Sequence, residues 1–465
     1  MRIARTVFLS ASLLIASLAA RGAELPAGMR AQIDKDVASI LAKSGAPGAS
    51  IAVVREGDLA YENAYGSADL AKKAPASPSM RYAIGSISKQ FLAASVLLLV
   101  EEGRLALDDK VVRWFPDLTR ANEITLRNLL SMTSGYSDYW PQDYVMPMML
   151  ADATPEQIID AWARRPLDFE PGSKYQYSNT NYVIAARIVE KVSGMPYFAF
   201  LQKRIFEPLG MATVVDVDGT PLPESDPARY HRHALAPVRP APKEGKGWLF
   251  GMGSLAMTAR DLATWDRAMI DGKLLTPKSW RALQREMQLV SGTGTQYGLG
   301  VGVSMAEGRR RVSHGGEVSG FTATNSVYPD QRAAVVALVN LDATDASSQI
   351  ASAIGRALFA EADPAAETAL AQVKSVFSGL QKGTIDRSLF TDNANFYFSD
   401  DALADFRSSL GPLGRPQEIA PAGAKGERGG MTLRRYTVKF PKQTLRITTF
   451  ILPDGKIEQY TVAAQ

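Results

Sequence analysis

Strand-like sequence occurs at both ends of the first 360 residues, and the stretch between has helical spacing. Residues 48–66, "GASIAVVREGDLAYENAYG", contain two alternating apolar runs around a turn at 55–58, which predicts a β-hairpin. Strand-like patterns resume at 298–304, 321–328 and 333–339. Apolar residues recur at three- and four-residue steps in 87–102, 155–164, 181–194 and 259–271, which predicts helices. This order favours one α/β domain whose sheet is built from both ends of the segment.

The sequence changes character near residue 363. Residues 366–380 are predicted to be a helix and 389–398 a strand. Further on, "RRYTVKF", "TLRITTFIL" and "KIEQYTV" alternate between apolar and polar residues, as strands do. We therefore expect a first domain at 24–362 and a separate, smaller α+β domain at 363–465.

The first 23 residues have the pattern of a secretory signal peptide. Arg2 and Arg5 precede the apolar run "VFLSASLLIASLAA", and small residues follow at a cleavage region between Ala20 and Ala23. An apolar run of 14 residues is short for a membrane span. We expect a secreted or periplasmic protein with no stable membrane insertion after cleavage.

Composition excludes several classes of function. The chain contains no cysteine, so disulfides and a cysteine nucleophile are excluded. The formal net charge of +4 is small for 465 residues, and nothing in it indicates a nucleic-acid partner. His231 and His233 lie in the proline-rich stretch 221–242 and are predicted to be solvated loop residues. We expect no metal site and no cofactor.

Residues 82–98, "YAIGSISKQFLAASVLL", place Ser86 three residues before Lys89 at the start of a predicted apolar helix. Residues three apart share a helix face, so the lysine amine can reach the serine hydroxyl. Apolar neighbours limit water around Lys89, and desolvation disfavours the charged amine. Such a lysine can take a proton from a serine. The alternative for this pair alone is a helix-capping Ser86 with an exposed Lys89.

Two further motifs help to decide between a catalytic pair and a capping serine with an exposed lysine. Tyr177 and Asn179 stand two apart in "YQYSNTNY", and His314 precedes Gly315 and Gly316 in "SHGGEVSGF", next to a predicted strand. A strand edge of small residues lets a substrate backbone approach closely.

Together, Ser86-x-x-Lys89, Tyr177-x-Asn179 and His314-x-Gly316 resemble, in order and spacing, the serine hydrolases related to class C β-lactamases and penicillin-binding proteins. The resemblance covers residues 25–360 and includes the peptidase and esterase branches. It implies a β-lactamase/transpeptidase-like α/β fold, with an antiparallel sheet flanked by helices and an all-helical region. The C-terminal domain resembles α+β rolls of the nuclear-transport-factor and cystatin-like kind, a fold that by itself assigns no chemistry.

The resemblance also implies roles for individual residues. Ser86 would be the nucleophile that forms an acyl-enzyme. Lys89 and Tyr177 would share the proton transfers, and the resemblance leaves open which is the general base. Asn179 would bind Lys89 and a substrate amide.

The third motif would supply part of the substrate site. Beside Gly316, the backbone N–H groups of Ser86 and Glu317 would form the oxyanion hole. His314 stands where class C β-lactamases have the lysine of Lys-Thr-Gly, which helps to bind the carboxylate of a β-lactam. We therefore expect poor penicillin hydrolysis. Met132, where many relatives have histidine, is expected to pack behind the site.

These features predict an exported serine hydrolase that cleaves an amide or ester bond through an acyl-serine intermediate. We expect a D-amino-acid peptidase or carboxypeptidase-like enzyme acting on a small peptide, such as one derived from peptidoglycan. The alternatives are a small-ester esterase or weak β-lactamase and, from another class, a non-catalytic cell-wall-binding or sensor protein. The sequence does not indicate the oligomeric state.

Overall fold

The computed structural model describes residues 24–142, 144–218, 220–360, 363–423 and 425–465. The predicted signal peptide at 1–23 lies outside these residues. The chain divides into two compact units, the first ending at Phe359 and the second running from Ala360 to Gln465. Within the described ranges, no helix has both the length and the hydropathy needed to cross a bilayer.

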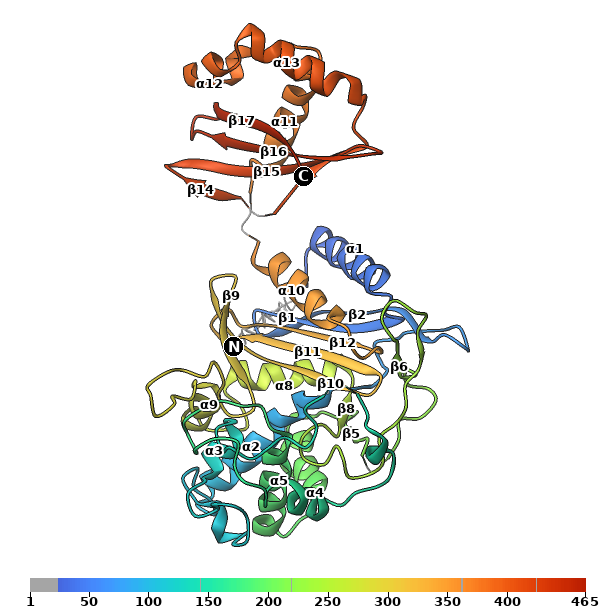
Figure 1. The fold of residues 1–465 in the computed structure, drawn as a ribbon, viewed down its shortest axis with the longest axis vertical. Coiled ribbons are helices and arrows are strands. Elements are labelled where there is room, and N and C mark those ends of the chain that lie inside the picture. The colour runs from blue at the N-terminus through green and yellow to red at the C-terminus, as the bar shows by residue number, and fades with distance from the viewer. Residues whose placement is uncertain (1–23, 143, 219, 361–362, 424) are drawn as a thin grey trace, which may run out of the picture. The chain divides into compact units, whose positions relative to one another are not determined.

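A seven-stranded antiparallel sheet forms the centre of the first unit, in the order β3-β2-β1-β12-β11-β10-β9. The N-terminal hairpin lies beside the strands from the end of the unit (Figure 1), which confirms a sheet built from both ends of the segment. The strands are β1 (Gly48–Arg55), β2 (Asp58–Asp69), β3 (Ala74–Pro75), β9 (Gly302–Ala306), β10 (Arg309–Val318), β11 (Phe321–Tyr328) and β12 (Ala333–Val339).

Helices cover both faces of this sheet, with α1 (Ala27–Ser44) and α10 (Ala346–Phe359) on one side and α8 (Ala259–Asp271) on the other (Figure 1). In β1, Ile51 and Val53 pack in the core next to α1 and α10, whereas Ala52 and Val54 pack in the larger core that includes α2 (Ser88–Glu101) and α8. Burial on both faces explains why β1 and β12 have nearly continuous apolar sequences.

The helical region lies between the two halves of the sheet in sequence. Thr154 and Thr258 cap the N-termini of α4 and α8 through their side-chain oxygens. Gly194, with a φ of 74°, caps the C-terminus of α5. The α-helices of the unit are α1 (Ala27–Ser44), α2 (Ser88–Glu101), α3 (Leu126–Leu130), α4 (Pro155–Trp162), α5 (Asn179–Ser193), α6 (Tyr197–Leu201), α7 (Glu207–Leu209), α8 (Ala259–Asp271), α9 (Pro277–Gln284) and α10 (Ala346–Phe359). The short strands are β4 (Tyr82–Ala83), β5 (Val215–Asp216), β6 (Tyr230–His231), β7 (Arg239–Pro240) and β8 (Leu255–Met257).

The second unit is an α+β domain with a five-stranded antiparallel sheet. Its strands follow the order β13-β15-β16-β17, and β14 also pairs with β15. Helix α11 contributes Val373, Val376 and Phe377 to the core, which includes Tyr436 and Ile447 of the sheet. The elements are α11 (Ala366–Leu380), α12 (Asp392–Tyr397), α13 (Asp400–Leu410), β13 (Glu418–Pro421), β14 (Gly426–Arg428), β15 (Met431–Lys439), β16 (Thr444–Ile451) and β17 (Ile457–Ala464).

The predicted strand at 389–398 is wrong, because this stretch contains helix α12. The side chain of Thr391 accepts a hydrogen bond from the backbone N–H of Ala394, and Asp392 lies in the first turn, where its charge favours a helix. Phe390 and Phe398, which flank α12 in the sequence, are both buried.

Candidate active site

Ser86 lies in a 3₁₀ turn, Gly85–Ile87, that leads directly into α2. Gly85 has a φ of 51°, a conformation that suits glycine, and a β-carbon there would lie 2.7 Å from the backbone nitrogen of Glu317. From residue 82 to residue 99, every residue is buried except Ser86. The turn therefore exposes one hydroxyl at the end of an otherwise buried helix.

Lys89 is buried within this helix and makes three polar contacts. Its Nζ lies 2.8 Å from Ser86 Oγ, 2.8 Å from Asn179 Oδ1 and 3.0 Å from the carbonyl oxygen of Met252. Burial lowers the pKa of Lys89 to about 7, while the charge of Asp138 acts in the opposite direction. A large fraction of Lys89 is therefore neutral near pH 7 and able to accept a proton.

Tyr177 and Asn179 are placed by the beginning of α5, where Asn179 is the first helical residue. Lys89 Nζ lies 4.9 Å from the centre of the Tyr177 ring. The Tyr177 phenol is hydrogen-bonded to Ser86, and burial raises its pKa well above the ordinary value. The phenol therefore keeps its proton near pH 7 and can donate it.

Strand β10 brings Gly316 and Glu317 next to the turn that contains Ser86. A β-carbon at Gly316 would lie 1.9 Å from the carbonyl oxygen of Ile84 and 3.4 Å from the backbone nitrogen of Ser86. Only glycine fits this approach. It places the backbone nitrogens of Ser86 and Glu317 on neighbouring segments, as an oxyanion-binding pair requires.

His314 on β10 is held by two hydrogen bonds. Its Nδ1 faces the carbonyl oxygen of Gly315, which can only accept, and its Nε2 lies 2.9 Å from the hydroxyl of Tyr297. Nδ1 therefore carries the proton, and Nε2 accepts from Tyr297. Burial, followed by the nearby charge of Lys89, lowers the pKa of His314 to about 4. The imidazole is thus uncharged at neutral pH and provides no fixed positive charge.

These residues open onto a cleft of about 850 Å³. Trp140, Tyr144 and Val145 contribute to its wall, and His231 and His233 also line it. Other residues that line the cleft include Ser86, Asp138, Tyr177, Asn179, Arg232, Met252, His314, Gly316, Glu317, Asp342 and Thr344. No cluster of three or more metal-ligating side chains occurs among the described residues.

The structure thus brings together all seven residues selected from the sequence: six line the cleft, and Lys89 contacts Ser86 behind it. The sequence analysis missed Asp138, Met252 and Tyr297. Met252 contributes a backbone carbonyl, which has no signal in the sequence. Asp138 and Tyr297 lie in loops whose pairing with Asn179 and His314 follows only from the tertiary fold.

The sheet, the helical region and the Ser86–Lys89–Tyr177 arrangement define a serine hydrolase of the β-lactamase/transpeptidase type. The sequence profile of the Beta-lactamase family matches residues 33–357, and the chain belongs to this family.

Penicillin-binding protein 4* of Bacillus subtilis (strain 168) is 28% identical over 363 residues, which cover 75% of this chain and 78% of the relative. A D-aminopeptidase of Brucella anthropi is 29% identical over 303 residues, which cover 64% of this chain and 56% of the relative. This chain therefore spans little more than half the length of that D-aminopeptidase. The crystal structure of the D-amino acid amidase from Ochrobactrum anthropi SV3 superposes with a TM-score of 0.65 at 24% identity, over 71% of this chain and 99% of the amidase, and shows the shared fold.

Proposed function

We propose that this protein hydrolyses an amide bond of a D-amino-acid peptide or amide through an acyl-Ser86 intermediate. The contacts of Lys89 carry the proposal. The Met252 carbonyl and the Asn179 side-chain oxygen can only accept hydrogen bonds, so a neutral lysine amine donates both of its hydrogens to them. Its lone pair then faces the Ser86 hydroxyl at 2.8 Å. This arrangement favours Lys89 as the general base.

In the first half of the reaction, the Ser86 proton passes to Lys89 while Oγ forms a bond to the substrate carbonyl carbon. The negative charge moves to the carbonyl oxygen, where the N–H groups of Ser86 and Glu317 stabilise it. When the C–N bond breaks, the Tyr177 phenol donates a proton to the leaving amine and is reprotonated from Lys89. Water then attacks the ester by the same route and releases the acid and free Ser86.

Two observations support a D-amino-acid amide as the substrate. The relatives named above include a D-aminopeptidase and a D-amino acid amidase. In addition, the residues that line the cleft include three acidic ones, Asp138, Glu317 and Asp342, whereas Arg232 is the single arginine or lysine among them. Such a lining favours a substrate with a free amino group over one with a carboxylate next to the scissile bond.

We also propose that the enzyme acts outside the cytoplasm, on the basis of the leader sequence at 1–23. The mass of the mature chain purified from its host tests this: an intact N-terminus would contradict export with cleavage.

The decisive experiment compares wild type and Ser86→Ala on matched substrates: D- and L-alanine p-nitroanilide, p-nitrophenyl acetate and nitrocefin. We expect the D-anilide to be hydrolysed faster than the L-anilide and nitrocefin to be the poorest substrate. Removal of the nucleophile should lower kcat/KM by about 10⁴-fold or more. Unchanged hydrolysis by Ser86→Ala would refute the mechanism, and preference for the L-anilide would refute the substrate class.

A further inference from the structure

We propose that Asp138 is a positioning residue, which fixes the orientation of the Asn179 amide and thereby points the Lys89 lone pair at Ser86. The inference rests on the proposed function. We call Lys89, Asn179 and Asp138 the active-site relay, because Asn179 joins the amine to the carboxylate.

The direction of each hydrogen bond in the relay is fixed by chemistry. Asp138 Oδ1 accepts from the backbone N–H of Asn179 at 2.9 Å and from that of Trp140 at 3.2 Å. Asp138 Oδ2 lies 3.3 Å from Asn179 Nδ2. Because an ionised carboxylate only accepts, Asn179 must turn its NH₂ group to Asp138 and its oxygen to Lys89. A flipped amide would place the Asn179 NH₂ group against the Lys89 amine and lose both hydrogen bonds.

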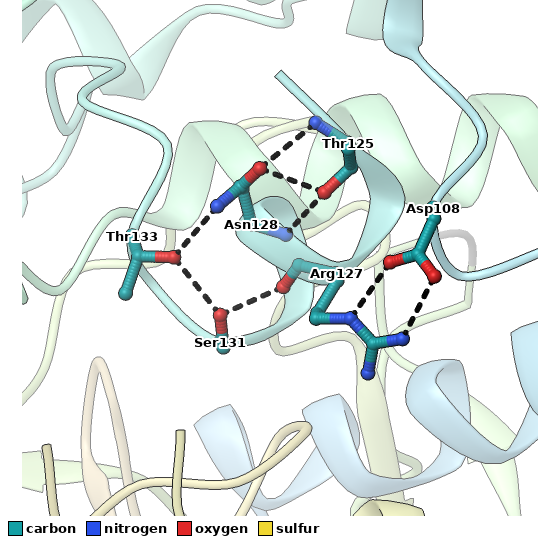
Figure 2. A network of polar contacts seen from close by, with 6 residues as sticks. All are labelled: Asp108, Thr125, Arg127, Asn128, Ser131 and Thr133. Carbon is teal, nitrogen blue, oxygen red and sulfur yellow. Dashed lines mark hydrogen bonds and ion pairs between the residues drawn. The ribbon is translucent and has the colours of Figure 1, made fainter. Parts of the chain in front are cut away.

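A polar network around α3, shown in Figure 2, precedes Asp138 in the chain. The Asn128 side chain accepts from the backbone N–H and the hydroxyl of Thr125 and donates to the Thr133 hydroxyl at 3.1 Å. Ser131 lies 3.1 Å from the same Thr133 hydroxyl. These contacts hold the chain that leads to Asp138.

The chain that leads to Asp138 is also bonded to the first turns of α5. Ser134 donates to Asn181 Oδ1 at 2.6 Å, and Met132, which has a φ of 62°, accepts through its sulfur from the backbone N–H of Ser178 at 3.3 Å. Asp138 is therefore held in place relative to Asn179, and Met132 packs behind the site.

The other side chains that face Lys89 are uncharged at neutral pH. A change of charge at Asp138 should therefore shift the pKa of Lys89, and with it the pH dependence of the reaction. Tyr177 and Tyr182 face the amine with their rings at 4.9 and 5.3 Å, and both keep their protons because burial raises their pKa values. His314 is uncharged at neutral pH, as is Tyr139 next to Asp138. Burial raises the pKa of Asp138, while the hydrogen bonds from the backbone N–H groups of Asn179 and Trp140 and the charge of Lys89 act in the opposite direction. The negative charge of ionised Asp138 favours the protonated Lys89 amine.

The test is the pH dependence of two reactions of Ser86: turnover of the best substrate, and covalent labelling by a fluorophosphonate. In wild type we expect the rate to rise with pH as Lys89 loses its proton, with an apparent pKa of about 7. We call this rise the acid limb of the pH profile. Asp138→Asn removes the negative charge, so the apparent pKa of the acid limb should fall by about one pH unit. The misoriented Asn179 should also lower the plateau about 10- to 100-fold.

Asp168→Asn is the matched control. Asp168 accepts hydrogen bonds from Ser137, the residue before Asp138, at 2.5 Å and from Gln176, but none from Asn179. It should leave the acid limb and the plateau unchanged. A purely structural role for Asp138 would lower the rate equally at every pH, and that outcome would overturn the proposal.

The exchange Asp138→Asn with Asn179→Asp sharpens the test. The new amide at position 138 would donate to the new carboxylate at position 179, which would accept from Lys89, so each donor again meets an acceptor. The carboxylate would now contact Nζ directly, and we expect the acid limb to move above that of wild type and the plateau to exceed that of Asp138→Asn. If Asp138→Asn does not fold, as judged by its melting curve, the exchange variant decides alone, and an unshifted acid limb refutes the proposal. Wild-type reactions that do not depend on Ser86 would instead refute the proposed function.

Discussion

Helix α2 carries the beginning of one buried hydrogen-bond relay at Lys89 and part of another at Gln90. The active-site relay runs from Lys89 through Asn179 to Asp138 and borders the cleft. The second, which we call the core relay, consists of Trp265, Gln90, Asn325 and Asp266. Trp265 Nε1 donates to Gln90 at 2.9 Å, Gln90 donates to Asn325 at 3.1 Å, and Asn325 donates to both oxygens of Asp266 at 2.7 and 2.8 Å.

Both relays pass through a side-chain amide and end in an aspartate, yet they have different consequences. The core relay begins at an indole, which does not titrate, and all four of its residues are buried. The active-site relay begins at an amine whose pKa lies near neutrality and which contacts an accessible hydroxyl. A buried polar network can therefore take part in proton transfer when its first group titrates near neutral pH and contacts a group that borders a cleft.

The largest expected effect comes from breaking the active-site relay at its first group. Lys89→Met keeps the length of the side chain but removes the base, so kcat/KM should fall by about 10³- to 10⁴-fold. Steady-state kinetics on the best substrate measure the loss. Retention of more than a tenth of wild-type activity would rule out Lys89 as the base.

Asp266 gives the next largest effect, on stability instead of rate. Burial raises the pKa of Asp266 to about 8, so between pH 4 and pH 8 the folded protein holds a proton that the unfolded chain has lost. Its contribution to the free energy of unfolding therefore falls as pH rises, by about 1.4 kcal/mol per pH unit. Asp266→Asn removes this dependence. Urea titrations of both proteins at pH 5, 6 and 7 should show the difference, and parallel curves would contradict it.

The smallest expected effect comes from the beginning of the core relay. Trp265→Phe leaves the side-chain oxygen of Gln90 without its donor and should lower the free energy of unfolding by about 2 to 3 kcal/mol. kcat/KM should stay within about two-fold of wild type, because no atom of the active-site relay is removed. Thermal melts and kinetics on the same preparation test both parts. A larger loss of kcat/KM would show that the two relays are coupled through α2.

Local patterns in the sequence predict some parts of this molecule well. Strands β11 and β12 have the predicted bounds: β12 is a continuous apolar run that is buried along its whole length, and β11 contains the β-branched and aromatic residues typical of strands. The Ser86–Lys89 contact is also local, since one helical turn joins the two residues. The prediction for β9 is less accurate: Gly300 has a φ of 72° and packs against the backbone of Lys89, so the strand begins only at Gly302.

The relays themselves could not be predicted from the sequence. Asp138 pairs with Asn179 only when its loop packs against α5, and Gln90 pairs with Asn325 only when α2 packs against β11. An isolated aspartate or glutamine in a sequence gives no sign of which distant amide it will meet. The strand prediction at 389–398 failed for a different, local reason, because the N-cap at Thr391 favours helix α12.

The contact between Gly316 and Ile84 has a consequence for how activity is acquired during folding. Ser86 and Lys89 come together as soon as one turn of α2 forms, but the partner N–H from Glu317 belongs to a strand near the end of the first unit. A chain that has formed its helices but has not closed its sheet would hold a serine and a lysine without the second oxyanion donor. Return of enzymatic activity on refolding therefore reports closure of the sheet, whereas helical circular dichroism does not.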